Sequence, residues 1–269
     1  MKRFLPFILA IFCLAATVPF IAPTEIDVEE TLIYKSLSPA TTAPFKKGEK
    51  LKYKLAYGIL GGGSAIIEIR DEEKKLEGKS LLHIVGIGKS SSFWDAFYKV
   101  RDRYETYVEE ETFHPRLFLR NVDEGGYQFT QDYQFYPEKQ VVKTQDENEL
   151  DVPMNVQDMM SDFFYARTFD FTNIKQGDIV TVQSFVDDEI FPLSIKFLGY
   201  DDINVKAGKY NCMKFAPLVQ QGRIFKTEDD LTVWISNDAN KIPVKAEAKI
   251  LIGSVTMELA RAGTPMLVL

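Results

Sequence analysis

The sequence predicts a mainly β protein built on an antiparallel sheet, with one or two short helices. Three observations support this fold class. Apolar and polar residues alternate with a period of two over many stretches, such as 127–135 and 179–185, which is typical of strands with one buried face. The same succession of strands and turns occurs twice along the chain. A long helical period is confined to residues 155–167.

The N-terminus predicts an exported protein. Met1-Lys2-Arg3 precedes an apolar run that begins at Phe4, which is the order of a secretory signal. We expect cleavage after Ala16 or Ala22 and a periplasmic or extracellular location, with a retained N-terminal anchor as the alternative. The expected divisions are a signal peptide (1–22), a linker rich in proline, serine and threonine (23–43), a single β-rich domain (44–262) and a tail (263–269).

Charge and cysteine content exclude two classes of partner. The formal net charge is −7, and removal of the signal with Lys2 and Arg3 would bring it to −7 − 2 = −9. Such a chain repels phosphate backbones and has no long basic cluster, so we expect no nucleic-acid binding. Only Cys212 would remain after export, so the domain needs no disulfide and no disulfide-linked partner.

Two copies of one plan are suggested by matching turn markers. The markers are Gly48, Gly78 and Pro115 in the first copy, and Gly177, Gly208 and Pro243 in the second. The spacings are 78 − 48 = 30 against 208 − 177 = 31, and 115 − 48 = 67 against 243 − 177 = 66. Each copy is therefore predicted to be a meander of four or five strands, with residues 116–173 between them.

The stretch VWISNDANKIPVK, residues 233–245, could be a binding site or a turn between strands. Asn237, Asp238 and Asn240 favour turns through local side-chain to backbone hydrogen bonds, and Pro243 suits the start of the outgoing strand. A calcium loop would need a central glycine and a later glutamate, which are missing. The corresponding stretch of the first copy, 107–116, keeps the aromatic residue and the proline but not these polar side chains. We therefore predict a turn.

Two segments depart from the strand period. Residues 91–98 are predicted to form a helical turn with a serine cap. Residues 155–167 are predicted to form a helix capped by Asn155, with an apolar arc of about 140°. The arc comprises Val156, Met159, Met160, Phe163 and Phe164. Arg167 falls in the same arc. Either it extends to solvent from the last turn, or it pairs with a ligand head group or an internal carboxylate at an apolar pocket.

Motifs for catalysis, metals and cofactors are missing. His83 and His114 lack metal-ligand spacing to each other and to Cys212. The chain has no G-x-S-x-G motif, P-loop or dinucleotide fingerprint. Acidic groups such as 109–111 and 187–189 fall at strand ends or turns, where solvated carboxylates are expected. We predict no enzyme activity, no catalytic residue, no metal and no cofactor.

Four motifs together resemble a known family. They are the G-E/D pairs at 48–49 and 177–178, DMMSDFFYAR (158–167), GKYNC (208–212) and WISNDANKIP (234–243). Over residues 44–262 the chain resembles exported bacterial proteins of the domain of unknown function 3108 family. The resemblance implies a curved antiparallel sheet, forming a half-open barrel or β-spiral with short helices over its concave side. There is a weaker, fold-level likeness to periplasmic lipoprotein-carrier half-barrels, which hold acyl chains.

The resulting hypothesis is a non-enzymatic cell-envelope protein that binds a lipid or acyl chain in a β half-barrel, covered by the 155–167 segment. The candidate ligand-binding residues are Phe93, Trp94, Phe97, Met160, Phe163, Phe164 and Trp234, with Arg167 for the head group. The alternative is a structural or protein-docking module of the envelope with a filled core, a partner protein and no small-molecule ligand.

Overall fold

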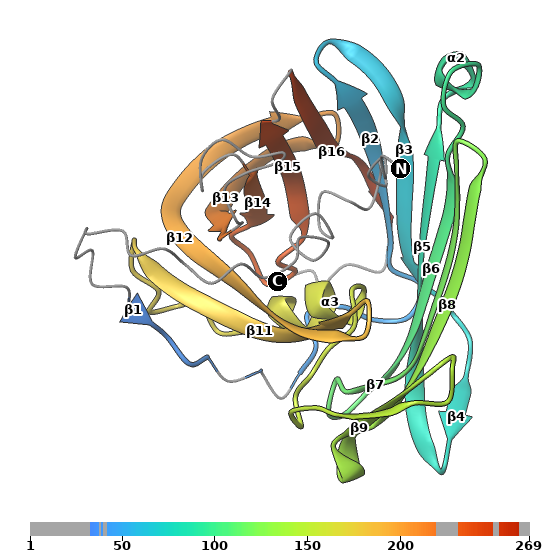
Figure 1. Ribbon diagram of the computed structural model, residues 1–269. Helices are drawn as coiled ribbons and strands as arrows, with labels where there is room; N and C mark the ends of the chain where they lie inside the picture. The colour runs from blue at the N-terminus through green and yellow to red at the C-terminus, as the bar shows by residue number, and fades with distance from the viewer. Residues whose placement is uncertain (1–32, 38, 40–41, 219–230, 250–252, 264–269) are drawn as a thin grey trace, which may run out of the picture.

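The strands form one sheet that curls strongly and does not close (Figure 1). The computed structural model describes residues 33–37, 39, 42–218, 231–249 and 253–263. The predicted signal peptide, the first half of the predicted linker (residues 23–32) and the predicted tail after Gly263 lie outside these ranges. Within the described chain, the mainly β prediction is confirmed, as is a curved open sheet with two α-helices.

The elements have the following bounds. The first part holds β1 (Ile33–Tyr34), β2 (Lys50–Tyr57), β3 (Leu60–Ile69), β4 (Lys74–Leu76), β5 (Lys79–Ser90), α2 (Ser92–Asp95), β6 (Arg101–Glu109), β7 (Pro115–Glu124), β8 (Tyr127–Tyr136), the 3-10 helix η1 (Pro137–Lys139), β9 (Val141–Thr144) and β10 (Glu149–Asp151). The second part holds α3 (Ser161–Arg167), β11 (Asp178–Val186), β12 (Glu189–Val205), β13 (Gly208–Pro217), β14 (Leu231–Ser236), β15 (Pro243–Lys249) and β16 (Ser254–Gly263).

Two antiparallel meanders make up most of the sheet. The strand order is β1-β11-β12-β13-β14-β15-β16-β2-β3-β5-β6-β7-β8-β9-β10, and β4 pairs with β5 off this path. The second meander, β11 to β16, therefore occupies one half of the strand order, and the first meander and the strands that follow it, β2 to β10, occupy the other half. Strand β16 pairs with β2 and joins the two meanders. The only parallel strand pair in the described part is the short one between β1 and β11.

The two meanders share detailed features, as the matching turn markers predicted. Gly48 and Gly177 both have positive φ, 84° and 95°, a conformation that glycine adopts at low cost. The Gly48 N–H donates to the Ile69 carbonyl oxygen, and the Gly177 N–H donates to the Phe197 carbonyl oxygen, both at 2.8 Å. In each case the acceptor lies in the second strand of the same meander. A register shift follows at the same place in both copies, between β6 and β7 and between β14 and β15.

The stretch at 233–245 is a turn between β14 and β15. The Asp238 carboxylate accepts hydrogen bonds from Ser236 Oγ at 2.8 Å and from the backbone N–H groups of Asn240 and Lys241 at 2.9 and 3.1 Å. Pro243 begins β15. The turn prediction is confirmed, because Asp238 bonds within its own loop, while the Asn237 side chain donates to Asn211 Oδ1 of β13 at 3.0 Å.

Helix α3 lies inside the curve of the sheet (Figure 1), but it is shorter than the predicted helix 155–167. Gln157 is instead held like a strand residue by β11, with backbone bonds to Gln183 and Phe185 of 2.8 and 2.7 Å. Asn155 was the wrong cap, since its side chain accepts from His114 Nε2 at 3.2 Å. The pairing with β11 delays the start of the helix until Ser161.

Asp158 supplies the cap that the prediction assigned to Asn155. Its Oδ1 accepts from the N–H groups of Met160 and Ser161 at 2.8 and 2.9 Å, while its own N–H donates to Ser161 Oγ at 2.8 Å. This reciprocal arrangement satisfies backbone donors at the first turn. It also fixes α3 above β11, where the site described next is formed.

Candidate functional site

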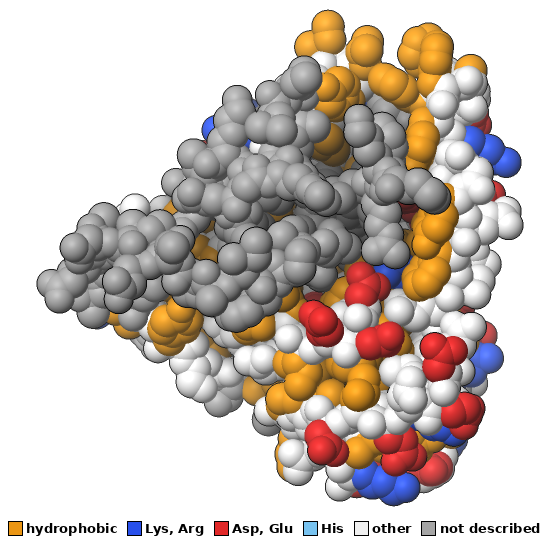
Figure 2. All heavy atoms as spheres, viewed as in Figure 1, with side chains coloured by type: hydrophobic (Ala, Val, Ile, Leu, Met, Phe, Trp, Pro, Cys, Tyr) orange, Lys and Arg blue, Asp and Glu red, His pale blue; other side chains and the backbone are white. Residues whose placement is uncertain are grey.

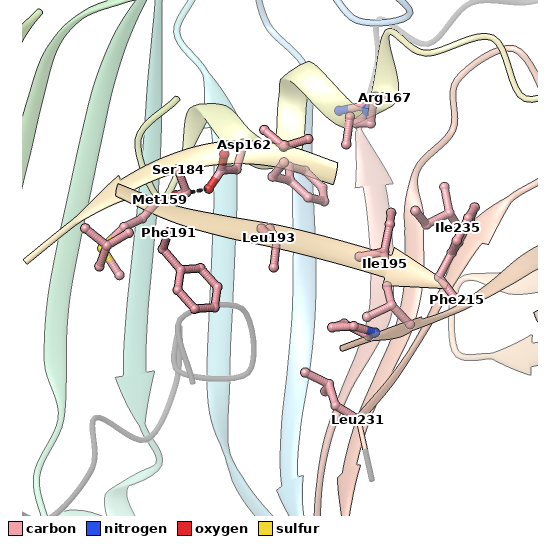
Figure 3. Close-up of a pocket in the computed structure, with 16 residues that line it drawn as sticks. Met159, Asp162, Arg167, Ser184, Phe191, Leu193, Ile195, Phe215, Leu231 and Ile235 are labelled. Carbon is pink, nitrogen blue, oxygen red and sulfur yellow. Dashed lines mark hydrogen bonds between the residues drawn. The ribbon is translucent and has the colours of Figure 1, made fainter. Parts of the chain in front are cut away.

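A pocket lies between α3 and the inner face of β11 to β14 (Figure 3). Its free volume is about 80 Å³. The lining residues are Met159, Asp162, Phe163, Ala166 and Arg167 on the α3 side, and Val182, Ser184, Val186, Phe191, Leu193, Ile195, Phe215, Pro217, Leu231, Val233 and Ile235 on the sheet side. All but three of these side chains are apolar.

Strand register explains why the sheet side of the pocket is apolar. Val182 is paired with Leu193, Ser184 with Phe191, and Phe215 with Val233. Directly paired residues point to the same face of a sheet, so alternate positions of four strands meet on one wall. Among them Phe191 and Leu193 are only half-buried, although they face the interior. The wall therefore has apolar surface that no side chain of the described chain fully covers.

One end of the pocket is polar. There Ser184 Oγ donates to Asp162 Oδ2 at 2.5 Å, from β11 to α3 (Figure 3). Asp162 Oδ1 is buried and has no hydrogen-bond partner among the described residues. Burial raises the pKa of Asp162 to about 8, against the opposing effect of Ser184 and with a smaller contribution from Asp158. A carboxyl with this pKa is mostly neutral at pH 7.

Asp158, just outside the pocket lining, is also buried. Burial raises its pKa to about 6, although Thr106 Oγ1 of β6 and the cap donors stabilise its charged form. The bond from Thr106 is 2.5 Å long and ties the α3 segment to the first meander. Asp158 and Asp162 thus connect α3 to β6 and β11 respectively, and burial disfavours the charged form of both.

Arg167 ends α3 and is fully buried, so the prediction that it extends to solvent was wrong. Its Nη1 and Nη2 donate to the Glu49 carboxylate at 2.6 and 2.9 Å. Its Nε and Nη2 donate to the Asn240 carbonyl at 3.2 and 2.9 Å. The arrangement agrees with the other alternative, in which Arg167 pairs with an internal carboxylate. Glu49 precedes β2 and Asn240 lies in the β14–β15 turn, so one guanidinium links both meanders.

The structure brings two of the eight candidate binding residues to the pocket, Phe163 and Arg167. Met160 and Phe164 are buried nearby but are not among the lining residues; Phe164 packs edge-on against Phe45, with ring centroids 5.0 Å apart. Trp234 lies between Val233 and Ile235 and therefore points to the opposite face of β14. Its Nε1 donates to Asp201 at 3.1 Å, and Lys214 and Lys245 lie over its ring.

The remaining candidates, Phe93, Trp94 and Phe97, lie at α2, away from the pocket lining. The sequence reasoning also missed most of the wall, in particular Phe191, Leu193 and Ile195 of β12. A signal was present, since these three apolar residues alternate with Pro192 and Ser194. Alternation identifies a buried face, but it does not tell which buried faces keep a free volume.

His83 meets two carboxylates in a separate cluster. Its Nδ1 lies 2.5 Å from Glu72 Oε1 and its Nε2 lies 2.6 Å from Glu105 Oε2, and its ring stacks on Tyr107 with centroids 4.3 Å apart. Because both ring nitrogens are engaged, neither is open to a substrate proton. His83 is not among the pocket-lining residues.

Within the described ranges, no three metal-binding side chains are grouped in a way that could hold an ion. In the same ranges, no helix has the length and apolar character needed to cross a bilayer. Cys212 is fully buried, and burial raises its thiol pKa to about 12, which leaves it unreactive at neutral pH.

The chain matches the model of a family described as protein of unknown function (DUF3108) over residues 52–260. Among solved structures it is similar to a β-barrel-like protein of the DUF1849 family from Brucella abortus. The identity is 10%, the TM-score is 0.52, and 84% of this chain and 98% of that chain are covered. At this identity the likeness shows the fold alone, and it agrees with a curved, barrel-like sheet.

Two further structures are more distant. A candidate lipoprotein from Parabacteroides distasonis is 11% identical, with a TM-score of 0.35 and coverage of 84% of this chain and 99% of that chain. A candidate exported protein with a YmcC-like fold from Bacteroides fragilis is 8% identical, with a TM-score of 0.36 and coverage of 84% and 100%. These scores carry no argument about this chain. Comparison with curated proteins gives no match.

Proposed function

The chain belongs to the DUF3108 family of proteins of unknown function, and from that premise we propose a function on the geometry of its own pocket. It is an exported, non-enzymatic protein of the cell envelope that holds the apolar part of a lipid or acyl chain between α3 and the concave sheet. Export is supported by the charged and apolar order of residues 1–22.

The observation that carries this proposal is the half-buried apolar wall of β12 facing α3. Apolar side chains that face the interior but stay partly open gain free energy when a ligand covers them, about 25 cal/mol for each Å² removed from water. The free volume of about 80 Å³ is smaller than the ~150 Å³ engineered cavity that binds benzene. The pocket therefore suits the end of a chain better than a whole lipid.

The charges at the pocket favour a ligand portion without a negative charge. Arg167 was the candidate for an anionic head group, but its guanidinium is already bound by Glu49 and by the Asn240 carbonyl. Asp162, at the other end of α3, would repel a carboxylate once it ionises. An anion buried beside these groups would lack a compensating cation, so we expect the ligand's head to stay outside the pocket.

The experiment is binding of an acyl-chain dye, a neutral acyl chain with its fluorophore at the head end so that only the chain enters the pocket, followed by its fluorescence. We expect Leu193→Trp, which fills the pocket from β12, to weaken binding at least about tenfold. Ile190→Trp is the matched control, because Ile190 is exposed on the same strand with the opposite parity. It should leave binding unchanged. Solvent extracts of the purified protein, analysed by mass spectrometry, should contain an acyl-chain compound.

Two outcomes would contradict the proposal. One is a protein that neither binds the dye nor carries any lipid through purification. The other is equal binding by the Leu193→Trp and Ile190→Trp proteins, which would place the dye elsewhere on the molecule. Circular dichroism of both variants shows whether the fold is kept. A loss of binding is attributed to the filled pocket only when the variant protein is folded.

A structural or docking module with a filled core is the second candidate function. The observation that favours it is the small free volume of the pocket compared with the typical ~300–1,000 Å³ of ligand pockets. On this alternative the α3 segment serves to lock the two meanders together through Arg167. Absence of bound lipid, together with unchanged stability after addition of the dye, would favour this candidate.

A further inference from the structure

Three neighbouring turns, at one end of the strands of the first meander, present apolar side chains to water. We call this surface the apolar tip. It consists of Ile59 and Leu60 at the β2–β3 turn, Phe93 and Phe97 at α2, and Tyr127 at the β7–β8 turn. Ile59 is 101% exposed, Phe93 64% and Phe97 73%. Figure 2 shows hydrophobic side chains projecting at the top of the view, where Figure 1 places α2 and the β2–β3 turn.

The apolar tip is held in place by specific contacts. The rings of Phe93, Trp94 and Phe97 form one cluster. The centroid of Phe93 lies 5.7 Å from that of Phe97 and 5.7 Å from that of Trp94, and the centroids of Trp94 and Phe97 are 6.4 Å apart. Trp94 Nε1 donates to the Gly61 carbonyl at 2.8 Å, which fixes α2 to the β2–β3 turn. The Tyr98 ring lies so close to Gly125 that an added Cβ would meet it at 2.3 Å.

Those contacts join all three turns into one surface without covering it. The indole N–H of Trp94 is hydrogen-bonded, but the rings of Phe93 and Phe97 stay in water. Holding two large apolar side chains in water costs free energy in an isolated protein. In the described chain, Phe93 and Phe97 are among the most exposed of the large apolar side chains. The aromatic rings are therefore ordered for contact with something outside the fold.

The exposed charged residues beside α2 in the apolar tip are basic, although the chain as a whole is acidic. The chain carries a net charge of −7, but the exposed charged residues that flank these turns most closely in the sequence are Lys89 and Lys99, on either side of α2, whereas Asp123 and Glu124, before the β7–β8 turn, are half-buried and buried. The nearby Asp95 is bound by Arg101 at 2.6 Å and by Ser90 at 2.5 Å. Its charge is therefore neutralised within the fold.

We propose that the apolar tip docks this protein on the surface of a lipid bilayer that carries anionic head groups. Aromatic side chains favour the membrane–water interface, and apolar residues on protruding turns can enter the outer part of the bilayer while the sheet stays in water. The lysines would contact phosphates, with each basic residue strengthening binding about fivefold. This docking is independent of the pocket, since no residue of the tip lines it.

The experiment is flotation with vesicles of phosphatidylcholine mixed with phosphatidylglycerol, combined with Trp94 fluorescence. The chain has two tryptophans, and Trp234→Phe leaves Trp94 as the only tryptophan. We expect vesicles to shift its emission to the blue and brominated lipids to quench it. Both the full chain and the chain from residue 23, the predicted mature form, are used, so that the apolar N-terminal run cannot account for the result.

Substitutions test which residues are responsible. Phe93→Ser with Phe97→Ser should lower vesicle partitioning at least about tenfold. Leu76→Ser is the control, because Leu76 is exposed beside another hairpin turn, at β4, and it should have no effect. Lys89→Glu with Lys99→Glu should weaken binding to the mixed vesicles more than to pure phosphatidylcholine.

Three results would overturn the proposal: no change in Trp94 emission with vesicles, equal partitioning of the Phe93/Phe97 and Leu76 variants, or a dimer in solution that the Phe93→Ser/Phe97→Ser protein loses. The last result would assign the apolar tip to a protein contact. Dye binding in the pocket is measured on the same variants and should be unchanged, so failure here does not bear on the pocket.

Discussion

At the scale of single residues, the buried pair of Arg167 and Glu49 has the widest structural consequence. A buried ion pair adds little net stability compared with apolar residues of similar size, but loss of one partner leaves an unpaired charge in the core. Here the guanidinium also bonds to the Asn240 carbonyl. The pair therefore fixes how α3, the start of β2 and the β14–β15 turn meet.

Arg167→Met should lower the free energy of unfolding by about 3–5 kcal/mol, because it leaves the Glu49 carboxylate buried without its partner. Adding Glu49→Leu to the same protein should recover part of this loss. Urea denaturation of the two single variants and the double variant measures the coupling. Lys143→Met, which breaks the partly exposed pair with Glu147, should cost less than about 1 kcal/mol. Purely additive effects of the Arg167 and Glu49 changes would contradict this account.

The raised pKa of Asp162 predicts a definite direction of pH dependence. The ordinary value for this carboxyl is 3.8 and the value in the folded protein is about 8. The folded state therefore binds more protons than the unfolded state between these values, and stability falls as pH rises through that window. The limiting slope for one site is about 1.4 kcal/mol for each pH unit.

Asp162→Asn should flatten this decline between about pH 6 and 8. Asp158 is the ionisable group that acts on Asp162, and because its own pKa is about 6 it contributes mainly below that window. Unfolding free energies from urea titrations at several pH values provide the measurement. Asp170→Asn is the control, since hydrogen bonds from Thr172 lower the pKa of that exposed carboxyl. An unchanged slope in Asp162→Asn would refute the assignment.

At the scale of elements, close approach of strands depends on small residues at a few positions. The Gly61-Gly62-Gly63 run lies inside β3, where the register with β2 shifts between Leu55 and Ala56. A Cβ on Gly63 would lie 2.2 Å from the Lys89 carbonyl oxygen of β5, whereas one on Gly61 would meet nothing within 4 Å. The run is thus a bulge beside a tight strand pair.

Gly63→Ala should destabilise the protein by about 2 kcal/mol or more, because backbone atoms of β5 would have to move. Gly61→Ala adds the same methyl group two residues away in the same strand and should stay within about 1 kcal/mol of the unmodified protein. Thermal and urea unfolding of the two variants provide the comparison. Equal stability of both proteins would show that β3 and β5 can separate at no cost.

At the scale of the whole molecule, β16 determines how the two meanders combine. It pairs with β15 on one side and with β2 on the other, and its Met257 and Leu259 are buried in the common core. The last described strand of the chain thus lies beside the first long one. The open ends of the sheet are instead β1 and β10.

Truncation after Lys249, which removes β16, should prevent cooperative folding, because it exposes the edges of β15 and β2 and removes part of the core. Truncation after Gly263 keeps β16 and should leave a folded monomer. Far-UV circular dichroism, size-exclusion chromatography and urea unfolding distinguish the two proteins. A Lys249 truncation that unfolds with the same midpoint as the longer protein would show that the meanders fold independently.

The sequence by itself determined the features that depend on neighbouring residues. Alternation predicted strands such as β8 and β11, and Asp238 and Pro243 predicted the β14–β15 turn. The turn glycines predicted that two meanders share one plan. These features follow from backbone preference and side-chain parity, which act over a few residues. The same parity could have shown that Trp234 faces away from Val233 and Ile235.

Only the tertiary structure decided the features that depend on distant residues. The helix begins at Ser161 because β11 holds Gln157, and Arg167 is buried because Glu49, far earlier in the chain, meets it. The pocket exists because the curvature of the sheet leaves space between α3 and β12. A local pattern marks which residues are apolar, but curvature and long-range pairing determine which of them touch and which enclose a free volume.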